Sequence, residues 1–126
     1  MADIEWRDLS RRDGLRLRED VIEVQAADER VQRVSVAEDE PGSLRIWTVV
    51  AHRSIVERLD KPELVAWVRN RHVEIVDFRI DSHGRLIGEA VVATAGLTGE
   101  EWGFYVRTVA NASDRLEYLL TGRDAE

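Results

Sequence analysis

The sequence contains no cysteine. Its absence excludes disulfides, thiolate catalysis and zinc sites built on cysteine ligands. The chain also lacks any run near the ~18 apolar residues that a membrane span requires. Residues 1–6 are acidic and contain no apolar run, unlike a signal peptide. We therefore expect a soluble, cytoplasmic protein.

Lysine is nearly absent: 17 arginines and one lysine stand against 25 acidic residues, for a formal net charge of −7. The arginines are scattered, whereas nucleic-acid binding usually needs a clustered basic face. We expect no nucleic-acid partner.

With 126 residues and 44% hydrophobic content, the chain predicts one domain over residues 1–126. Residues 1–13 are either a short helix or a loosely ordered segment.

The first half of the chain predicts three antiparallel strands, over residues 14–26, 30–38 and 44–51. Polar and apolar residues alternate in the second and third, as in half-buried strands. Turns are expected at residues 28–29 and at 39–43, where Pro41-Gly42 stands. The face of the third strand predicted to be buried carries Leu44, Ile46, Thr48 and Val50.

A helix is predicted from Asp60 to about Arg71. Asp60 can cap its amino terminus, Glu63 can complete a capping box, and Pro62 is tolerated in the first turn. The residues expected to be buried are Leu64, stapled onto Leu59, together with Val65 and Val68. Two more strands follow, over 72–81 and 85–93, joined by a turn at 81–84 that ends in glycine.

The last helix begins with Thr98-Gly99-Glu100-Glu101, a second capping box. It is predicted to run to about Leu120. The apolar stripe has spacings of three and four and comprises Trp102, Tyr105, Val106, Val109, Ala112, Leu116, Leu119 and Leu120. Phe104 lies about 100° from Tyr105, on a flank with Thr108, Asn111, Arg115 and Tyr118. The element order is β-β-β-α-β-β-α, an α+β pattern.

These segments resemble the type III secretion chaperone-like superfamily, which includes bacterial sensory-transduction-regulator-like proteins. The likeness rests on "DFRID", the "HGR" turn, "LIGEAVV", "GLTGEEW" and "ASDRLEYLL", and it covers about residues 59–121. It implies a curved antiparallel sheet with helices on one face, and homodimers are common. Members bind partner polypeptides without ATP and have no known active site.

The amino terminus departs from the family pattern, because secretion chaperones begin with a helix that packs on the sheet and helps hold the client. Here the segment "IEWRDLSRRDG" offers only Trp6 and Leu9 as apolar positions. A regulatory or partner-stabilising adaptor therefore fits the sequence better than a secretion chaperone.

We expect a non-enzymatic, homodimeric module that binds a client or regulatory protein, with no catalytic residue, cofactor or metal. Aromatic residues off the core stripes, with arginines beside them, suit a protein interface. The interface residues that we predict are Trp47, Arg45, Trp67, Phe104, Arg107 and Tyr118.

Two alternatives remain open. A small-ligand sensor would place a pocket between sheet and helices, lined by Trp67, Phe78 and Tyr105. An enzyme or metal protein would need ionisable side chains that converge. The candidates are Asp77, Asp81 and His83 for a metal and Glu100-Glu101 for acid–base chemistry, but turn and capping roles explain these residues more simply.

Overall fold

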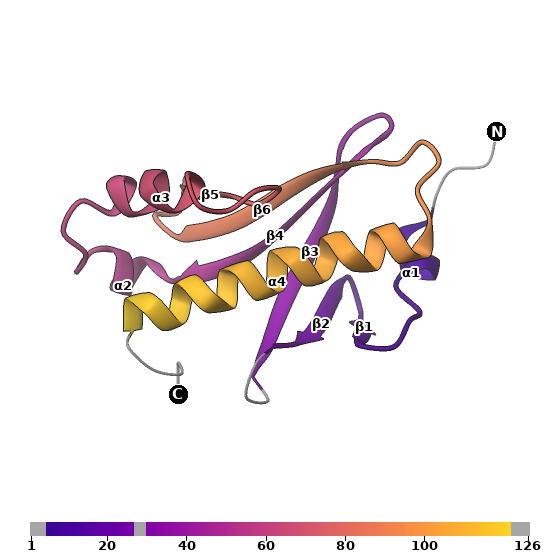
Figure 1. Cartoon of the computed structure of the whole chain (residues 1–126), viewed down its shortest axis with the longest axis horizontal. Helices are drawn as coiled ribbons and strands as arrows, with labels where there is room; N and C mark the ends of the chain where they lie inside the picture. The colour runs from indigo at the N-terminus through magenta and orange to yellow at the C-terminus, as the bar shows by residue number, and fades with distance from the viewer. Residues whose placement is uncertain (1–4, 27–29, 122–126) are drawn as a thin grey trace.

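A six-stranded antiparallel sheet forms the framework of the protein (Figure 1). The computed structural model describes residues 5–26 and 30–121. In spatial order the strands are β1 (Leu15–Arg18), β2 (Val21–Gln25), β3 (Val31–Glu40), β4 (Ser43–Ala51), β6 (Leu86–Ala93) and β5 (Asp77–Ile80). The helices are α1 (Trp6–Leu9), α2 (Arg53–Val56), α3 (Pro62–Asn70) and α4 (Gly99–Thr121).

The single strand expected over residues 14–26 is a hairpin, so the sheet has six strands and not five. The chain reverses at Glu19 and Asp20, where Glu19 takes a positive φ of 56°, and Arg18 then pairs with Val21. The expected turn at residues 28–29 lies outside the described residues. The turn with Pro41-Gly42 is confirmed, and its glycine has a φ of 87°.

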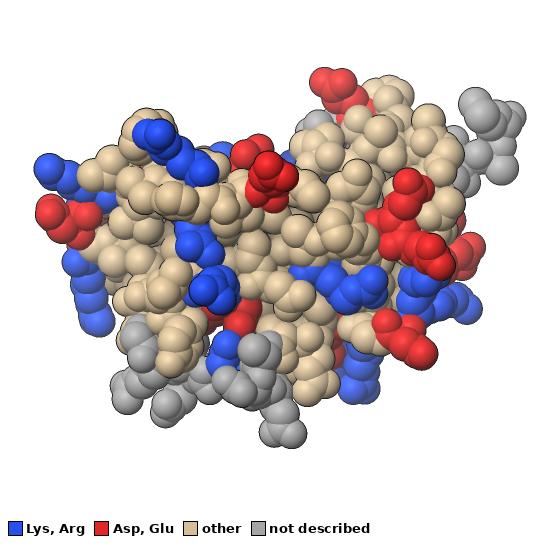
Figure 2. Space-filling model, in the orientation of Figure 1, with Lys and Arg blue, Asp and Glu red and all other residues tan. Residues whose placement is uncertain are grey.

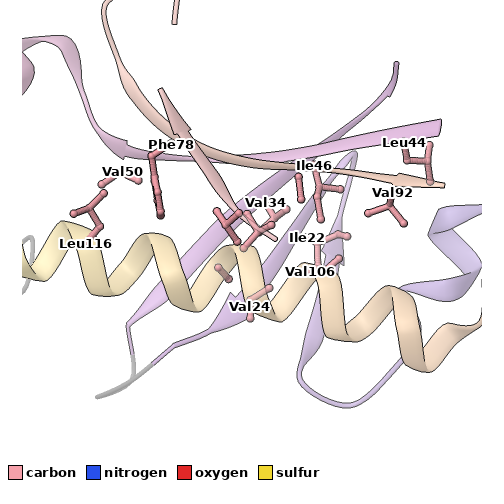
Figure 3. Packing of buried hydrophobic residues seen from close by; sticks show 14 of the residues in the cluster. Ile22, Val24, Val34, Leu44, Ile46, Val50, Phe78, Val92, Val106 and Leu116 are labelled. Carbon is pink, nitrogen blue, oxygen red and sulfur yellow. The ribbon is translucent and has the colours of Figure 1, made fainter. Parts of the chain in front are cut away.

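Helix α4 lies across one face of the sheet and closes the core (Figures 1 and 3). In Figure 3, Ile22, Val34 and Ile46 point from the strands toward Val106 of the helix. The predicted capping box is confirmed: Thr98 N–H donates to Glu101 Oε1 (2.9 Å) and Glu101 N–H donates to Thr98 Oγ1 (3.1 Å).

Trp102 is fully buried, as its predicted packing role requires. Val106, Val109 and Leu116 of the predicted apolar stripe are buried as well, but its other four residues are not. Leu119 is exposed, while Tyr105, Ala112 and Leu120 are half-buried. Small and polar residues take their place on the buried side: Gly103, Ala110, Ser113 and Asp114. The predicted stripe was therefore centred to one side of the face of α4 that is buried.

Helix α3 runs beside edge strand β5, so the expectation that both main helices cover one face holds for α4 alone. The Asn70 side chain donates to Phe78 O (3.0 Å) and accepts from Phe78 N–H (2.7 Å). The side-chain amide of Asn70 thus makes the two backbone hydrogen bonds that a neighbouring strand would otherwise make to Phe78 at this edge of the sheet.

The predicted cap at Asp60 is wrong. The residue before α3 is Lys61, with a φ of 55° and no side-chain capping bond. Leu64 and Val68 were expected in the core but are exposed, and Ala66 is the buried residue of this helix. Strand β5 begins at Asp77, five residues later than predicted, after Ile75 takes a φ of 77°.

Residues 6–9 form the short helix α1, which is tied to the core. Trp6 is buried with its ring centroid 6.3 Å from that of Trp102. Trp102 Nε1–H donates to Ser10 Oγ (2.9 Å), and the Ser10 hydroxyl donates to Trp6 O (2.7 Å). This chain of hydrogen bonds satisfies the polar atoms of a buried corner.

A buried polar network joins the carboxyl half of α4 to the sheet. Arg30 donates to both carboxylate oxygens of Asp114 at 2.9 and 2.7 Å, and Gln32 links Asp114 to Thr48. The hydrogen bonds from Arg30 lower the pKa of Asp114, against the opposing effect of burial. The pairing fixes where α4 crosses β3.

Candidate polypeptide-binding surfaces

Trp47 and Arg45 lie on the sheet face opposite α4, which we call the outer face. Strand alternation puts them there, since the intervening Ile46 is buried in the core. The Arg45 guanidinium carbon lies 4.5 Å from the centre of the Trp47 ring, a cation–π contact. Trp47 is half-buried.

Glu89 pairs with two arginines on the outer face. Arg45 Nε donates to one carboxylate oxygen at 2.7 Å, and Arg79 Nε donates to the other at 2.5 Å. Burial opposes ionisation of Glu89, but the hydrogen bonds from Arg79 and Arg45 outweigh it and lower its pKa. The guanidinium of Arg45 is thus already paired with a carboxylate of the same chain.

A second surface, the α3 surface, consists of Leu64, Trp67, Val68 and Ile75. Exposed fractions are 48%, 56% and 43% for the three helix residues and 46% for Ile75, which lies in the loop after the helix. Arg71 stacks over Trp67 with its guanidinium carbon 5.1 Å from the ring centre. An exposed apolar cluster of this kind marks an interaction site more often than a scattered apolar residue does.

The third surface is the outward side of α4, the α4 flank: Phe104, Arg107, Thr108, Asn111, Arg115 and Tyr118. Phe104 is 52% and Tyr118 46% exposed. Figure 2, seen from the α4 side, shows Lys or Arg side chains over two stretches of this helix and carboxylates gathered where it begins. The flank predicted from the sequence is therefore presented to solvent.

The six predicted interface residues are divided among these surfaces and do not form one site. Trp47 and Arg45 lie on the outer face, Trp67 on the α3 surface, and Phe104, Arg107 and Tyr118 on the α4 flank. Leu64 and Val68 were not predicted to be exposed, because their helical spacing suits a core stripe equally well.

The residues considered for a metal site or for acid–base chemistry have other roles in the structure. In the described ranges, no three His, Asp or Glu residues are grouped to hold an ion. Asp81 accepts the backbone amides of His83 and Arg85 (both 2.9 Å), the turn role expected of it. Glu101 is occupied by the helix cap.

The three residues predicted to line a ligand pocket differ in their exposure to solvent. Phe78 is buried in the core, Trp67 is exposed, and the half-buried Tyr105 packs edge-on against Phe104 with ring centroids 5.8 Å apart. A hollow of about 420 Å³ lies elsewhere, lined by Arg18, Glu19, Val21, Glu23 and Arg33. The sensor hypothesis stays a prediction.

Comparison with known proteins gives a likeness of structure. A chain in the crystal structure of the ExsC–ExsE complex superposes with a TM-score of 0.61, over 87% of this chain and 82% of that one. The two chains therefore share a fold. Sequence identity is 19%, so the likeness concerns the fold alone. No protein-family model and no curated protein matches the sequence.

Among the described residues, no helix combines the length and apolar character needed to cross a bilayer.

Proposed function

We propose that this chain is a non-enzymatic, chaperone-like module that acts in the cytoplasm as a homodimer and holds a partner polypeptide. The observation that carries the proposal is the exposure of large apolar side chains on α3 and α4 beside a closed core. Aromatic residues on such surfaces are enriched at protein interfaces, because a rigid ring buries much area at little entropic cost.

The structural likeness supports the same proposal. The similar chain was crystallised in a complex of two named proteins, ExsC and ExsE. A fold that presents helix faces and sheet edges around a filled core suits binding by complementary surfaces.

The α3 surface is suited to a second copy of this chain. A two-fold interface must be self-complementary. Glu63 stands in the first turn of α3 and Arg71 directly after its last residue. Two antiparallel copies centred near Trp67 therefore bring Glu63 of each toward Arg71 of the other while the apolar residues meet in the middle. This arrangement leaves α4 free for the partner.

Light scattering and partner capture test the proposal together. We expect the wild type to have twice the 14.4 kDa chain mass. Trp67→Glu should reduce the mass to that of one chain, because a charge replaces the ring at the centre of the interface. Phe104→Ala and Trp47→Ala should weaken capture of the host partner more than they lower the melting temperature.

A matched control separates binding from folding. Val24→Ala removes two buried methyl groups from the core and should lower the melting temperature without a specific loss of association at low temperature. A wild type that is monomeric at every concentration and captures nothing would rule out the proposed function.

A further inference from the structure

The α4 flank differs in charge from the rest of this acidic chain. After the first turn of α4, its outward charged residues are Arg107 and Arg115. Within the described ranges neither guanidinium lies within 4 Å of a carboxylate, in contrast to Arg45 and Arg79 on the outer face. Two cations on this flank thus have no carboxylate partner in the part of the chain that the structure describes, although the protein has a net charge of −7.

The acidic residues of α4 are engaged or lie away from the two arginines. Glu101 closes the helix cap, Asp114 is buried against Arg30, and Glu117 accepts from Gln32 Nε2 at 2.9 Å. Glu100 stands in the first turn, beside the helix amino terminus that favours a carboxylate. Internal pairing therefore does not neutralise the middle of the flank.

Aromatic rings bracket these arginines. Phe104 and Tyr118 are 14 residues apart, which is about 21 Å at ~1.5 Å per residue. Their own neighbours hold both rings: Phe104 packs against Tyr105, and the Arg30 guanidinium carbon lies 5.5 Å from the centre of the Tyr118 ring. Arg107 folds back along the helix, with its Nη1 3.1 Å from where a Cβ on Gly103 would stand.

We propose that the α4 flank binds an acidic, amphipathic segment of the partner polypeptide. Its apolar residues pack on the Phe104 and Tyr118 rings, and its carboxylates pair with Arg107 and Arg115. Arginine suits this role because its planar fork can donate two parallel hydrogen bonds to one carboxylate. The inference rests on the proposed function and adds the chemical class of the partner and the surface that recognises it.

A nucleic acid is a poorer match for the same surface. Phosphate backbones are commonly held by several cations, about six to ten contacts in a well-studied class of complexes. The flank supplies only two arginines after the first turn of α4, on a chain that is acidic overall. An acidic peptide segment requires fewer cations on the protein, and its apolar residues can also pack on the two rings.

The test uses two synthetic helical peptides with the same leucine positions, one with glutamate and one with lysine at every polar position. We expect the full-length protein to bind the dye-labelled glutamate peptide at least about tenfold more tightly, measured by fluorescence anisotropy. The affinity should fall as salt is raised. R107E/R115E should reverse the preference.

Arg33→Glu is the matched control. It reverses one charge on the outer face, where Arg33 is 76% exposed and lies 3.6 Å from Glu23, and it should leave the preference unchanged. Circular dichroism checks that each variant is folded. Equal binding of the two peptides, no binding up to about 1 mM, or tighter binding of a single-stranded oligonucleotide would overturn the inference. If the wild type still dimerises and captures its host partner, this inference alone fails and the proposed function stands.

Discussion

The indole N–H of Trp102 donates a hydrogen bond to the hydroxyl of Ser10, 92 residues away in sequence, at 2.9 Å. That hydroxyl in turn donates to Trp6 O. The amino-terminal helix is therefore fastened to the first turns of α4. Since α4 carries the proposed binding flank, this corner helps to fix the amino-terminal end of the surface.

Ser10→Ala should destabilise the fold by about 1–3 kcal/mol, because a buried indole N–H loses its acceptor. Urea unfolding measures the change. Ser82→Ala is the control: its hydroxyl is exposed and its contact with His83 is long, at 3.5 Å. Equal midpoints for the two variants would show that the Trp102–Ser10 bond contributes little.

Asp114→Asn should cost about 3 kcal/mol at neutral pH, because Arg30 loses its carboxylate partner in a largely buried site. The folded-state pKa of Asp114 is lowered, so its contribution to stability is present above the unfolded pKa of about 4. That contribution is lost as pH falls through the lower, folded value.

Urea midpoints between neutral pH and about pH 2 measure this contribution. The variant should lose less stability on acidification than the wild type. Glu89, Asp81 and Glu5 also have lowered pKa values and contribute to the slope that remains. Parallel curves for the two proteins would contradict the role of Asp114.

Gly88→Ala should destabilise the sheet–helix contact by about 1–3 kcal/mol. A Cβ on Gly88 would overlap Ser113 Oγ and lie 2.9 Å from Phe78 Cε1. Ser113 Oγ has no hydrogen-bond partner in the part of the chain that the structure describes, so Ser113→Ala should be nearly neutral. The double variant should recover part of the loss, and thermal unfolding of all four proteins measures that coupling. Strictly additive effects would show that the two residues do not constrain each other.

Charge exchange on α3 should switch self-association. Glu63→Arg and Arg71→Glu each place like charges together in the antiparallel pair of helices and should weaken the dimer about tenfold. The double variant restores opposite charges and should recover the dimer. Sedimentation velocity measures all three. Glu57→Arg, at the residue directly after α2, changes the charge as much as Glu63→Arg and should have no such effect. Failure of the double variant to recover would exclude this pairing.

The sequence predicted a helix or strand end correctly where capping or turn residues close to that end determine it. The box formed by Thr98 and Glu101 located the start of α4, since cap and partner are three residues apart. The hairpin at Glu19 was missed because no glycine or proline marks it. At Asp60 the capping pattern was present, but Lys61 takes a left-handed conformation and starts the helix one residue later.

The surfaces were harder to predict because periodicity does not say what covers an apolar face. Leu64 and Val68 have core-like spacing but are exposed, because α3 lies beside β5 and not over the sheet. Phe104 and Tyr118 were predictable, since they stand outside the stripe that fills the core. The pairing of Arg45 with Glu89 depends on strand register, which the sequence does not specify.

Hydroxyl-radical footprinting tests the central claim most directly, because it reports the solvent exposure of individual aromatic side chains. The protein bound to its co-purified partner is compared with the free, diluted protein. We predict slower oxidation of Trp67, Phe104 and Tyr118 in the complex, with the buried Trp102 unchanged as an internal reference. Equal oxidation of all three exposed rings in the free and bound protein would contradict the account.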